Sequence, residues 1–205
     1  MTIKRSLFGI LMTACAVGTF AATVTLQQGV SNYNGCTDAT LDAQNSGGNF
    51  GNSSDLNVLN ELCSSWTGTT IYRARAALRF DLAGVIPSGS QITAASLELF
   101  TYTKFGVSSE QQNGSKSVHV INKSWTESAI TWANTNSSYN STAVAQSTNS
   151  GTNAWEKFNV TSAVQGFFTN PGTNYGFMIN FPNQGFGIKM RSSEYGTAEQ
   201  RPKLV

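Results

Sequence analysis

The chain has 205 residues, of which 12% are charged and 40% are hydrophobic, and its formal net charge is +2 at pH 7. This hydrophobic share supports a packed core and excludes a disordered protein, and so small a net charge does not indicate nucleic acid as a partner. The length fits one domain. Recognition of an acidic ligand would therefore have to come from a local patch of basic side chains.

The first 22 residues have the pattern of a secretory signal peptide. Lys4 and Arg5 precede an apolar run, which is followed by small residues up to Ala22. The apolar run is too short for a membrane-spanning helix. We therefore expect cleavage near Ala22, a mature domain of residues 23–205, and export to the medium or the cell surface. Lipidation at Cys15 is the alternative.

Two cysteines, Cys36 and Cys63, are left after removal of the signal peptide. An even number of cysteines in an oxidising compartment predicts a disulfide between them. A metal site at these thiols is not indicated, because no histidine or further cysteine lies near them in the sequence.

Short segments of alternating polarity, separated by turns rich in glycine and asparagine, run through the mature chain. We expect strands at residues 23–30, 56–59, 73–82, 95–104, 117–122, 177–181 and 186–191. The only helical pattern covers residues 159–168, with Asn159 or Thr161 as its cap. The fold class is therefore all-β: an antiparallel β-sandwich of the jelly-roll type, formed by a single domain after the signal peptide.

The segment 73–82 carries the clearest functional signal. Read as a strand, it places alanine, leucine and phenylalanine on one face and Arg73, Arg75 and Arg79 on the other. Three like charges on one strand face are costly unless an anion meets them. That anion is either an internal carboxylate, such as Asp81 beside Arg79, or an external ligand.

Further cations and aromatic rings join this face if the neighbouring strands share its sheet. Guanidinium groups bind carboxylates and sulfates, and aromatic rings cover the faces of sugars. We therefore predict a site for an acidic polysaccharide made of Arg73, Arg75, Lys104, Lys189, Trp66 and Tyr102. Other candidate stacking residues are Tyr72, Tyr139 and Trp155.

A cation site is a separate hypothesis. Asp38, Asp42 and Asp55 offer the hard oxygen ligands that calcium prefers, although their spacing is not that of an EF-hand. A structural calcium ion held by these three residues is the only cofactor that the sequence suggests.

Several motifs, taken together and in order, carry a family resemblance. They are D-A-T-L from Asp38, N-F-G from Asn49, A-A-L-R-F-D-L from Ala76, W-T-E-S-A-I-T-W from Trp125, N-V-T-S-A-V-Q from Asn159, N-Y-G-F-M-I from Asn174, R-S-S-E from Arg191 and R-P-K-L-V from Arg201. This series resembles the DNRLRE-type domain, a family that includes alginate-binding carbohydrate modules. The resemblance implies a jelly-roll module that binds polysaccharide without catalysis. The chain departs from the family pattern at Asn159, where the family usually has Asp.

Two other functions are alternatives. A lone sandwich whose strand 23–30 is detached from its own sheet would assemble into an extracellular fibre by strand addition. A polysaccharide lyase is suggested by Tyr102, His119 and Arg191, but the order of these motifs differs from that of known jelly-roll lyases. We therefore expect no enzymatic activity.

Overall fold

The structure is a computed structural model that describes residues 21–65, 68–106, 114–148, 151–182 and 185–205. Within its strands, the side chains of residues 61–71, 105, 106 and 186 lie outside the description. Residues 1–20, which hold most of the expected signal peptide and Cys15, also lie outside it, and so does Trp66.

Strands dominate the described part of the chain. They are β1 (Leu26–Gln27), β2 (Cys36–Asp42), β3 (Asp55–Ser65), β4 (Gly68–Phe80), β5 (Ser96–Gly106), β6 (Lys116–Val120), β7 (Ala145–Ser147), β8 (Ala154–Asn159), β9 (Phe177–Asn180), β10 (Phe186–Arg191) and β11 (Lys203–Leu204). The helical segments are α1 (Trp132–Thr135), α2 (Thr161–Thr169) and the short 3-10 turns Pro171–Thr173 and Ala198–Gln200.

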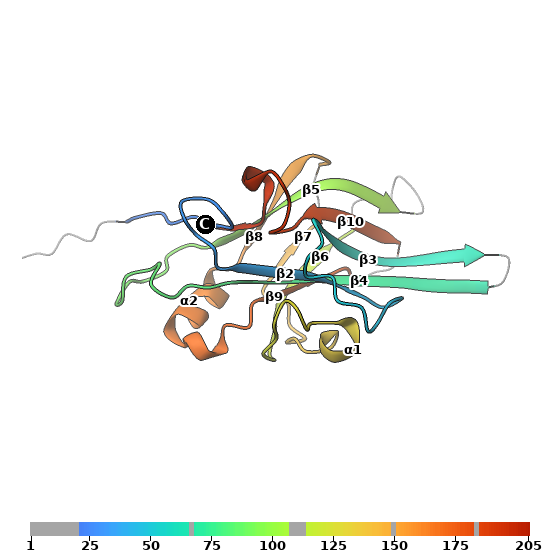
Figure 1. Ribbon diagram of the computed structural model, residues 1–205, viewed down its shortest axis with the longest axis horizontal. Helices are drawn as coiled ribbons and strands as arrows, with labels where there is room; N and C mark the ends of the chain where they lie inside the picture. Colours follow the sequence, from blue (N-terminus) through green and yellow to red (C-terminus); the bar gives the residue numbers. More distant parts are fainter. Residues whose placement is uncertain (1–20, 66–67, 107–113, 149–150, 183–184) are drawn as a thin grey trace, which may run out of the picture.

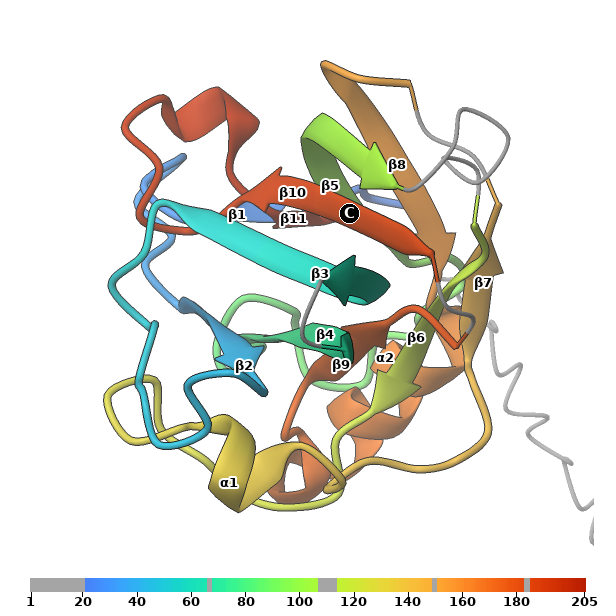
Figure 2. The same ribbon diagram turned by 90° about the vertical axis from the view of Figure 1, so that its right-hand side faces the viewer.

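The strands form two layers, which face each other in Figure 2. One layer contains β3, β10, β5, β8, β11 and β1, and the other contains β2, β4, β9, β6 and β7. All strand pairs are antiparallel. The predicted antiparallel β-sandwich is therefore confirmed.

Strand β3 joins the two layers. Its first half pairs with β10 and its second half pairs with β4. The resulting β3–β4 hairpin is long and projects beyond the other strands (Figure 1). The two layers are consequently linked by continuous strand pairing along one side of the sandwich.

The main core lies between the layers and follows the predicted alternation. Ala76, Leu78 and Phe80 of β4 face it, together with Leu97 and Leu99 of β5. Burial of each large apolar side chain contributes about 1.5–3 kcal/mol. The apolar face that the sequence assigned to residues 73–82 is therefore confirmed as a core face.

A second, smaller core lies on the outer side of the β4 layer. Residues 121–144, which include α1, fold back over this side (Figure 2). Trp125, Ile121 and Ile130 pack there against Ala77 and Met178. The W-T-E-S-A-I-T-W motif favours core positions for Trp125 and Trp132, and the structure agrees, since Trp125 is buried in this core and Trp132 packs against it. These apolar side chains close off the outer face of the sheet.

The turn before β9 fixes the first tryptophan of this core. Trp125 Nε1 donates to the carbonyl of Tyr175 at 2.7 Å. The next residue, Gly176, has φ +81°, and a Cβ atom there would lie 2.2 Å from the Leu78 carbonyl oxygen. Only glycine tolerates both this backbone conformation and this close approach.

Helix α2 confirms the one helical prediction. Val164 and Phe167 are buried. The predicted cap is wrong, because Val160 takes the N-cap position without a side-chain hydrogen bond, and Asn159, one residue earlier, accepts from the Thr161 amide at 3.1 Å. Neither this helix nor any other in the described ranges has the length and apolar character needed to cross a membrane.

The N-terminal strand is shorter than expected and is docked on its own sheet. It covers only Leu26–Gln27 instead of residues 23–30, and it pairs with β11. Gln27 also donates from its side chain to the carbonyl of Arg201 at 2.8 Å. The detached arm that fibre assembly by strand addition requires is therefore not present.

The predicted Cys36–Cys63 disulfide is wrong in this structure, where Cys36 is a buried free thiol. Cys36 pairs with Phe80 and Cys63 pairs with Thr70, both on β4. Those partners are separated by ten residues, or about 33 Å along a strand. A disulfide requires the two Cα atoms to lie within about 7 Å, so the strand register keeps the cysteines apart.

A buried ion pair crosses one end of the sandwich. Lys116 Nζ lies 2.8 Å from Glu156 Oε1, and the two side chains are only 2% and 1% exposed. Removal of one member of a buried pair leaves the other charge without compensation, which is more costly than loss of a surface pair.

We predict that Glu156→Gln lowers the free energy of unfolding by about 3 kcal/mol, because Lys116 would stay buried without its carboxylate. Urea unfolding monitored by tryptophan fluorescence measures this change. The matched control is Lys157→Gln on the same strand, whose side chain is 64% exposed and pairs with Glu98. That variant should lose less than about 1 kcal/mol. Equal losses in both variants would contradict the prediction.

We also predict that both cysteines of the mature chain are reduced. In denaturant, an alkylating reagent should label Cys36 and Cys63 without prior reduction. In the native state Cys36 should react slowly, because burial raises the pKa of its thiol and also blocks access. Peptide mass spectrometry reports both results. A linked Cys36–Cys63 peptide in an unreduced digest would show that the strand register described above is incorrect.

Candidate functional site

A hollow of about 660 Å³ lies in the described surface at the base of the β3–β4 hairpin. Its walls come from β3, β4, β6 and β9 and from the segment 137–146. The side chains that reach it are mainly basic, amide, hydroxyl and aromatic: Asn60, Arg73, Arg75, Ser117, His119, Ser137, Tyr139, Ser141, Gln146, Asn180 and Phe181. We call this hollow the hairpin pocket.

Arg75 is the basic residue most firmly built into the pocket. Its guanidinium lies 4.8 Å from the ring centre of Trp132 and 5.2 Å from that of Tyr139. It also donates to the carbonyl of Asn136. Burial lowers the pKa of Arg75, and the neighbouring charge of Arg73 adds to this effect. Arginine nevertheless stays charged at neutral pH, so the pocket holds a preoriented cation.

Arg73 supplies the second cation of the pocket and is exposed. It lies two residues before Arg75 on the same face of β4 and pairs with Asn60 of β3. Among the residues that the structure describes, neither arginine takes part in an ion pair. No Asp or Glu is among the described residues that line the pocket either. The described part of its wall is therefore positively charged.

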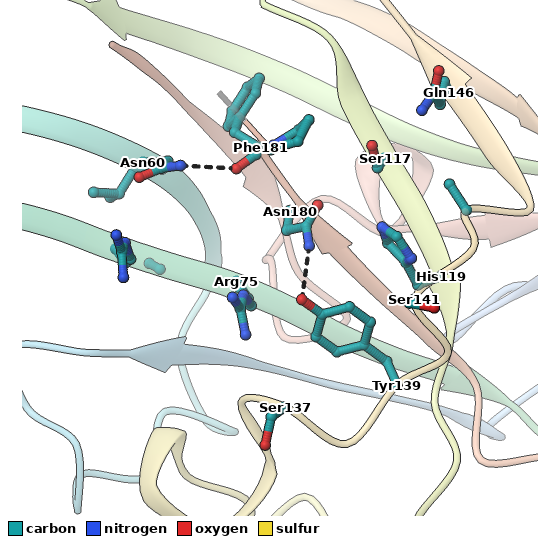
Figure 3. A pocket seen from close by; sticks show the side chains of 15 residues that line it. Asn60, Arg75, Ser117, His119, Ser137, Tyr139, Ser141, Gln146, Asn180 and Phe181 are labelled. Atoms are coloured by element: carbon teal, nitrogen blue, oxygen red, sulfur yellow. Dashed lines mark hydrogen bonds between the residues drawn. The ribbon is translucent and has the colours of Figure 1, made fainter. Parts of the chain in front are cut away.

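The opposite wall is formed by Tyr139, His119 and Asn180 (Figure 3). Asn180 Nδ2 donates to the Tyr139 hydroxyl at 3.3 Å, which leaves the phenolic proton available to a ligand oxygen. The ring centres of His119 and Tyr139 are 4.9 Å apart, and His119 Nδ1 lies 2.9 Å from the carbonyl of Asn140. The His119 side chain is buried against these groups.

Lys104 does not join the hairpin pocket. Between Lys189 and Met190 the pairing of β10 with β5 shifts by one residue, so Lys104 pairs with the core residue Ile188. Burial and the nearby charge of Lys116 lower the pKa of Lys104. The expectation that Lys104 lies on the same surface as Tyr102 is therefore wrong, because the bulge reverses which face its side chain occupies.

Lys189 and Tyr102 are likewise absent from the pocket lining. Tyr102 donates its hydroxyl proton to Asp55 at 2.8 Å, and burial together with this hydrogen bond raises its pKa to about 12. The guanidinium of Arg191 lies 3.6 Å from the centre of the Tyr102 ring and pairs with Asp55 at 3.0 Å. One ring face of Tyr102 is thus covered by Arg191. The stacking of Tyr102 on a sugar stays a prediction, and so does the binding of an acid group by Lys189.

The remaining aromatic candidates lie in different places. Tyr139 lines the pocket, and Tyr72 is 40% exposed on the hairpin strand beside it. Trp155 packs edge-on against Phe100, with Lys203 Nζ 4.2 Å from its ring centre. Tyr139 is therefore the aromatic candidate that the structure brings together with the arginines.

The contacts of Arg79 and Arg201 lie within the protein, and Arg79 forms no ion pair with Asp81 among the described residues. The guanidinium of Arg79 lies 5.3 Å from the ring centre of Trp125. Arg201 donates to the carbonyls of Tyr195 and Gln28 at 2.6 and 3.0 Å. Arg79 and Arg201 are therefore engaged in contacts within the protein.

The proposed calcium ligands do not come together as a set. Asp42 accepts from the amide of Gln44 at 2.8 Å, and Asp55 is engaged by Tyr102 and Arg191. Asp38 lies instead beside Glu127 and Glu194. The trio Asp38, Asp42 and Asp55 is therefore wrong in this structure. Asp38 lies near the start of β2 and Asp42 is its last residue, so the two carboxylates have different neighbours.

Sequence reasoning missed most of the pocket wall. His119 had been weighed only as a lyase residue, and Asn60, Asn180 and Gln146 had not been singled out. Single asparagine and glutamine residues carry no distinctive pattern in a chain rich in polar residues. Tyr139, an aromatic residue in a polar segment, was the one residue of this wall that the sequence identified as a candidate for sugar stacking.

An antiparallel β-sandwich with an open pocket of cationic, amide, hydroxyl and aromatic groups is typical of carbohydrate-binding modules. The sequence comparison agrees with this class. Residues 30–205 match carbohydrate-binding module family 96, and the chain belongs to this family. The family consists of non-catalytic binding modules. No curated protein matches the chain.

Proposed function

We propose that this carbohydrate-binding module binds an acidic polysaccharide in the hairpin pocket, as the resemblance to DNRLRE-type alginate-binding modules implies. The observation that carries this proposal is the charge of the pocket lining. Two guanidinium groups, those of Arg73 and Arg75, face a hollow whose described lining contains no carboxylate. A neutral sugar gives no reason for such a wall, whereas a uronic acid or a sulfated sugar does.

The two arginines would act in different ways. Arg75 is held by Trp132, Tyr139 and the Asn136 carbonyl, so little side-chain entropy is lost when it binds an anion. Arg73 is exposed and can reach a second acidic group on the same chain of sugars. Contacts at two successive acidic residues favour a polymer over a single sugar.

The uncharged groups suit the hydroxyls of a sugar. Ser117, Ser141 and Gln146 supply donors and acceptors along the β6–β7 side, and Tyr139 supplies a phenolic proton. The volume of about 660 Å³ lies within the range of about 300–1,000 Å³ that ligand pockets commonly have.

Affinity electrophoresis in gels that contain acidic or neutral polysaccharides tests this function. We predict that an acidic glycan retards the wild-type protein and that added salt weakens this effect. Arg73→Ala and Arg75→Gln should each reduce affinity by about tenfold, and the double variant should also show a flatter salt dependence, because two charge-assisted contacts are lost.

The matched control is Lys189→Ala, which removes a cation outside the hairpin pocket and should leave binding unchanged. Circular dichroism confirms that each variant is folded. Binding that depends on Lys189 and not on the arginines would move the site to the outer face of β10. Retardation by neutral glycans alone would reject the acidic ligand. An assay for unsaturated uronate products on the same samples tests the lyase alternative.

We further propose that the protein is exported, since its N-terminal segment has the pattern of a signal peptide and polysaccharides of this kind are extracellular. The expected N-terminus of the exported protein is Thr23, which intact-mass measurement of the secreted material identifies. A lipid-modified mass that begins at Cys15 would instead indicate an anchored protein.

A further inference from the structure

Three carboxylates from distant parts of the chain meet on the side of the molecule where β2 lies. Asp38 belongs to β2, Glu127 to the segment before α1, and Glu194 to the turn that follows β10. One oxygen atom of each lies within 4.8 Å of the other two. In the described ranges of the chain, no other group of three or more histidine, cysteine, aspartate or glutamate side chains converges in this way.

The protein backbone holds these carboxylates in place. Asp38 Oδ2 accepts from the amide of Ser193 at 2.8 Å, and the amide of Asp38 donates to Glu127 Oε1 at 2.8 Å. The Ser193 hydroxyl donates to Glu194 Oε1 at 2.8 Å. The cluster is therefore fixed by hydrogen bonds from two of its three segments.

The loop that carries Glu127 is itself anchored. Asn49 donates from its side-chain amide to the carbonyls of Glu127 and Ile130 at 2.7 and 2.8 Å. Gly51 lies so close that a Cβ atom there would be 2.6 Å from the Glu127 carbonyl oxygen. The N-F-G motif thus sets the position of the second carboxylate.

One oxygen of the cluster has no hydrogen-bond partner. Asp38 is 1% exposed, and its Oδ1 atom is buried without a donor in the described structure. A buried carboxylate oxygen that has lost its water without gaining a donor is costly. This atom therefore points to a ligand that accepts its lone pairs.

The charge balance of the cluster leads to the same conclusion. Among the described residues, none of the three carboxylates forms an ion pair. Arg79 acts on Glu127 electrostatically, but without a direct ion pair. Three acidic groups in one partly buried place repel one another unless a cation or a proton joins them.

We propose that Asp38, Glu127 and Glu194 bind a divalent cation of the calcium class. All three ligands are hard oxygen donors, which suit calcium, whereas zinc favours histidine and cysteine. Oxygens on opposite sides of a calcium ion are about 4.6–5.2 Å apart, so the 4.8 Å limit of this group fits one coordination sphere. Water would complete the shell on the exposed side of Glu194.

Such an ion would act as a cross-link. It would tie β2 to the end of β10 in the other layer and to the segment that covers the outer face of β4. The energetic gain follows mass action, because a cation that binds only the folded protein stabilises it in proportion to the logarithm of its concentration.

Thermal unfolding and titration calorimetry of the purified protein, after treatment with EDTA, test this site. Calcium chloride should raise the melting temperature by about 5 °C or more and should bind with a stoichiometry of about one. Magnesium chloride should have a smaller effect. Terbium should bind at the same place and show luminescence excited through Trp125, and calcium should displace it.

Glu194→Gln should weaken calcium binding by at least about tenfold, since it removes one of three ligand charges from an exposed position and leaves the fold intact. Asp38→Asn should abolish binding; if that variant does not fold, Glu194→Gln still decides the matter. The matched control is Asp42→Asn on the same strand, which should bind calcium like the wild type.

Three results would overturn the proposal. The first is a wild-type protein whose melting temperature, calorimetric heat and terbium luminescence do not respond to the ion. The second is equal calcium affinity in the wild type and Glu194→Gln. The third is a protein whose melting temperature does not change with calcium and rises as the pH falls, because the carboxylates would then share a proton instead of a cation.

Discussion

The double-sided burial of β4 is the constraint on which the rest of the structure depends. Ala76 and Ala77 are both fully buried, although they point to opposite faces of the strand. The pairing of β2 and β9 with this part of β4 also covers both of its edges. A strand closed on four sides leaves little room for large side chains, which explains the two alanines. The sandwich core packs on one face, and residues 121–144 must cover the other.

This covering segment determines the surroundings of the arginines on the outer face of β4. Arg75 and Arg79 flank Ala77 on the outer face, and each lies over an aromatic ring of the covering segment. Their charges therefore sit at the borders of the second core and are only partly exposed to water. Arg73, one step further toward the hairpin tip, is beyond the reach of these rings and is exposed. One strand face thus changes from packed to solvent-exposed along its length, and the hairpin pocket opens where this change occurs.

Alternating polarity was sufficient to predict the sandwich and the core face of β4, and a helical pattern was sufficient to predict α2. These features depend on local periodicity. It failed where distant pairing overrides the local period. The bulge opposite Lys189 and Met190 turns Lys104 to the core side, and no feature of residues 95–104 indicates it. The disulfide prediction failed for a related reason, since only the strand register shows that Cys36 and Cys63 lie far apart. The carboxylate cluster joins Asp38 to Glu127, 89 positions away in the chain, and to Glu194, which is still more distant.

Residues 121–144 also connect the two sites of the molecule. The segment is fixed near its start by Asn49, which holds the carbonyl of Glu127, and near its end by Asn180, which holds the hydroxyl of Tyr139. Between these points Arg75 binds the Asn136 carbonyl. The pocket wall is thus the far end of the same segment that presents a carboxylate to the proposed cation. Because the segment packs on β4 through Trp125 and Ile130, a cation that restrains its beginning also reduces the freedom of the wall. The ion would then contribute to glycan affinity without touching the sugar, since a wall that is already ordered loses less entropy when the ligand binds.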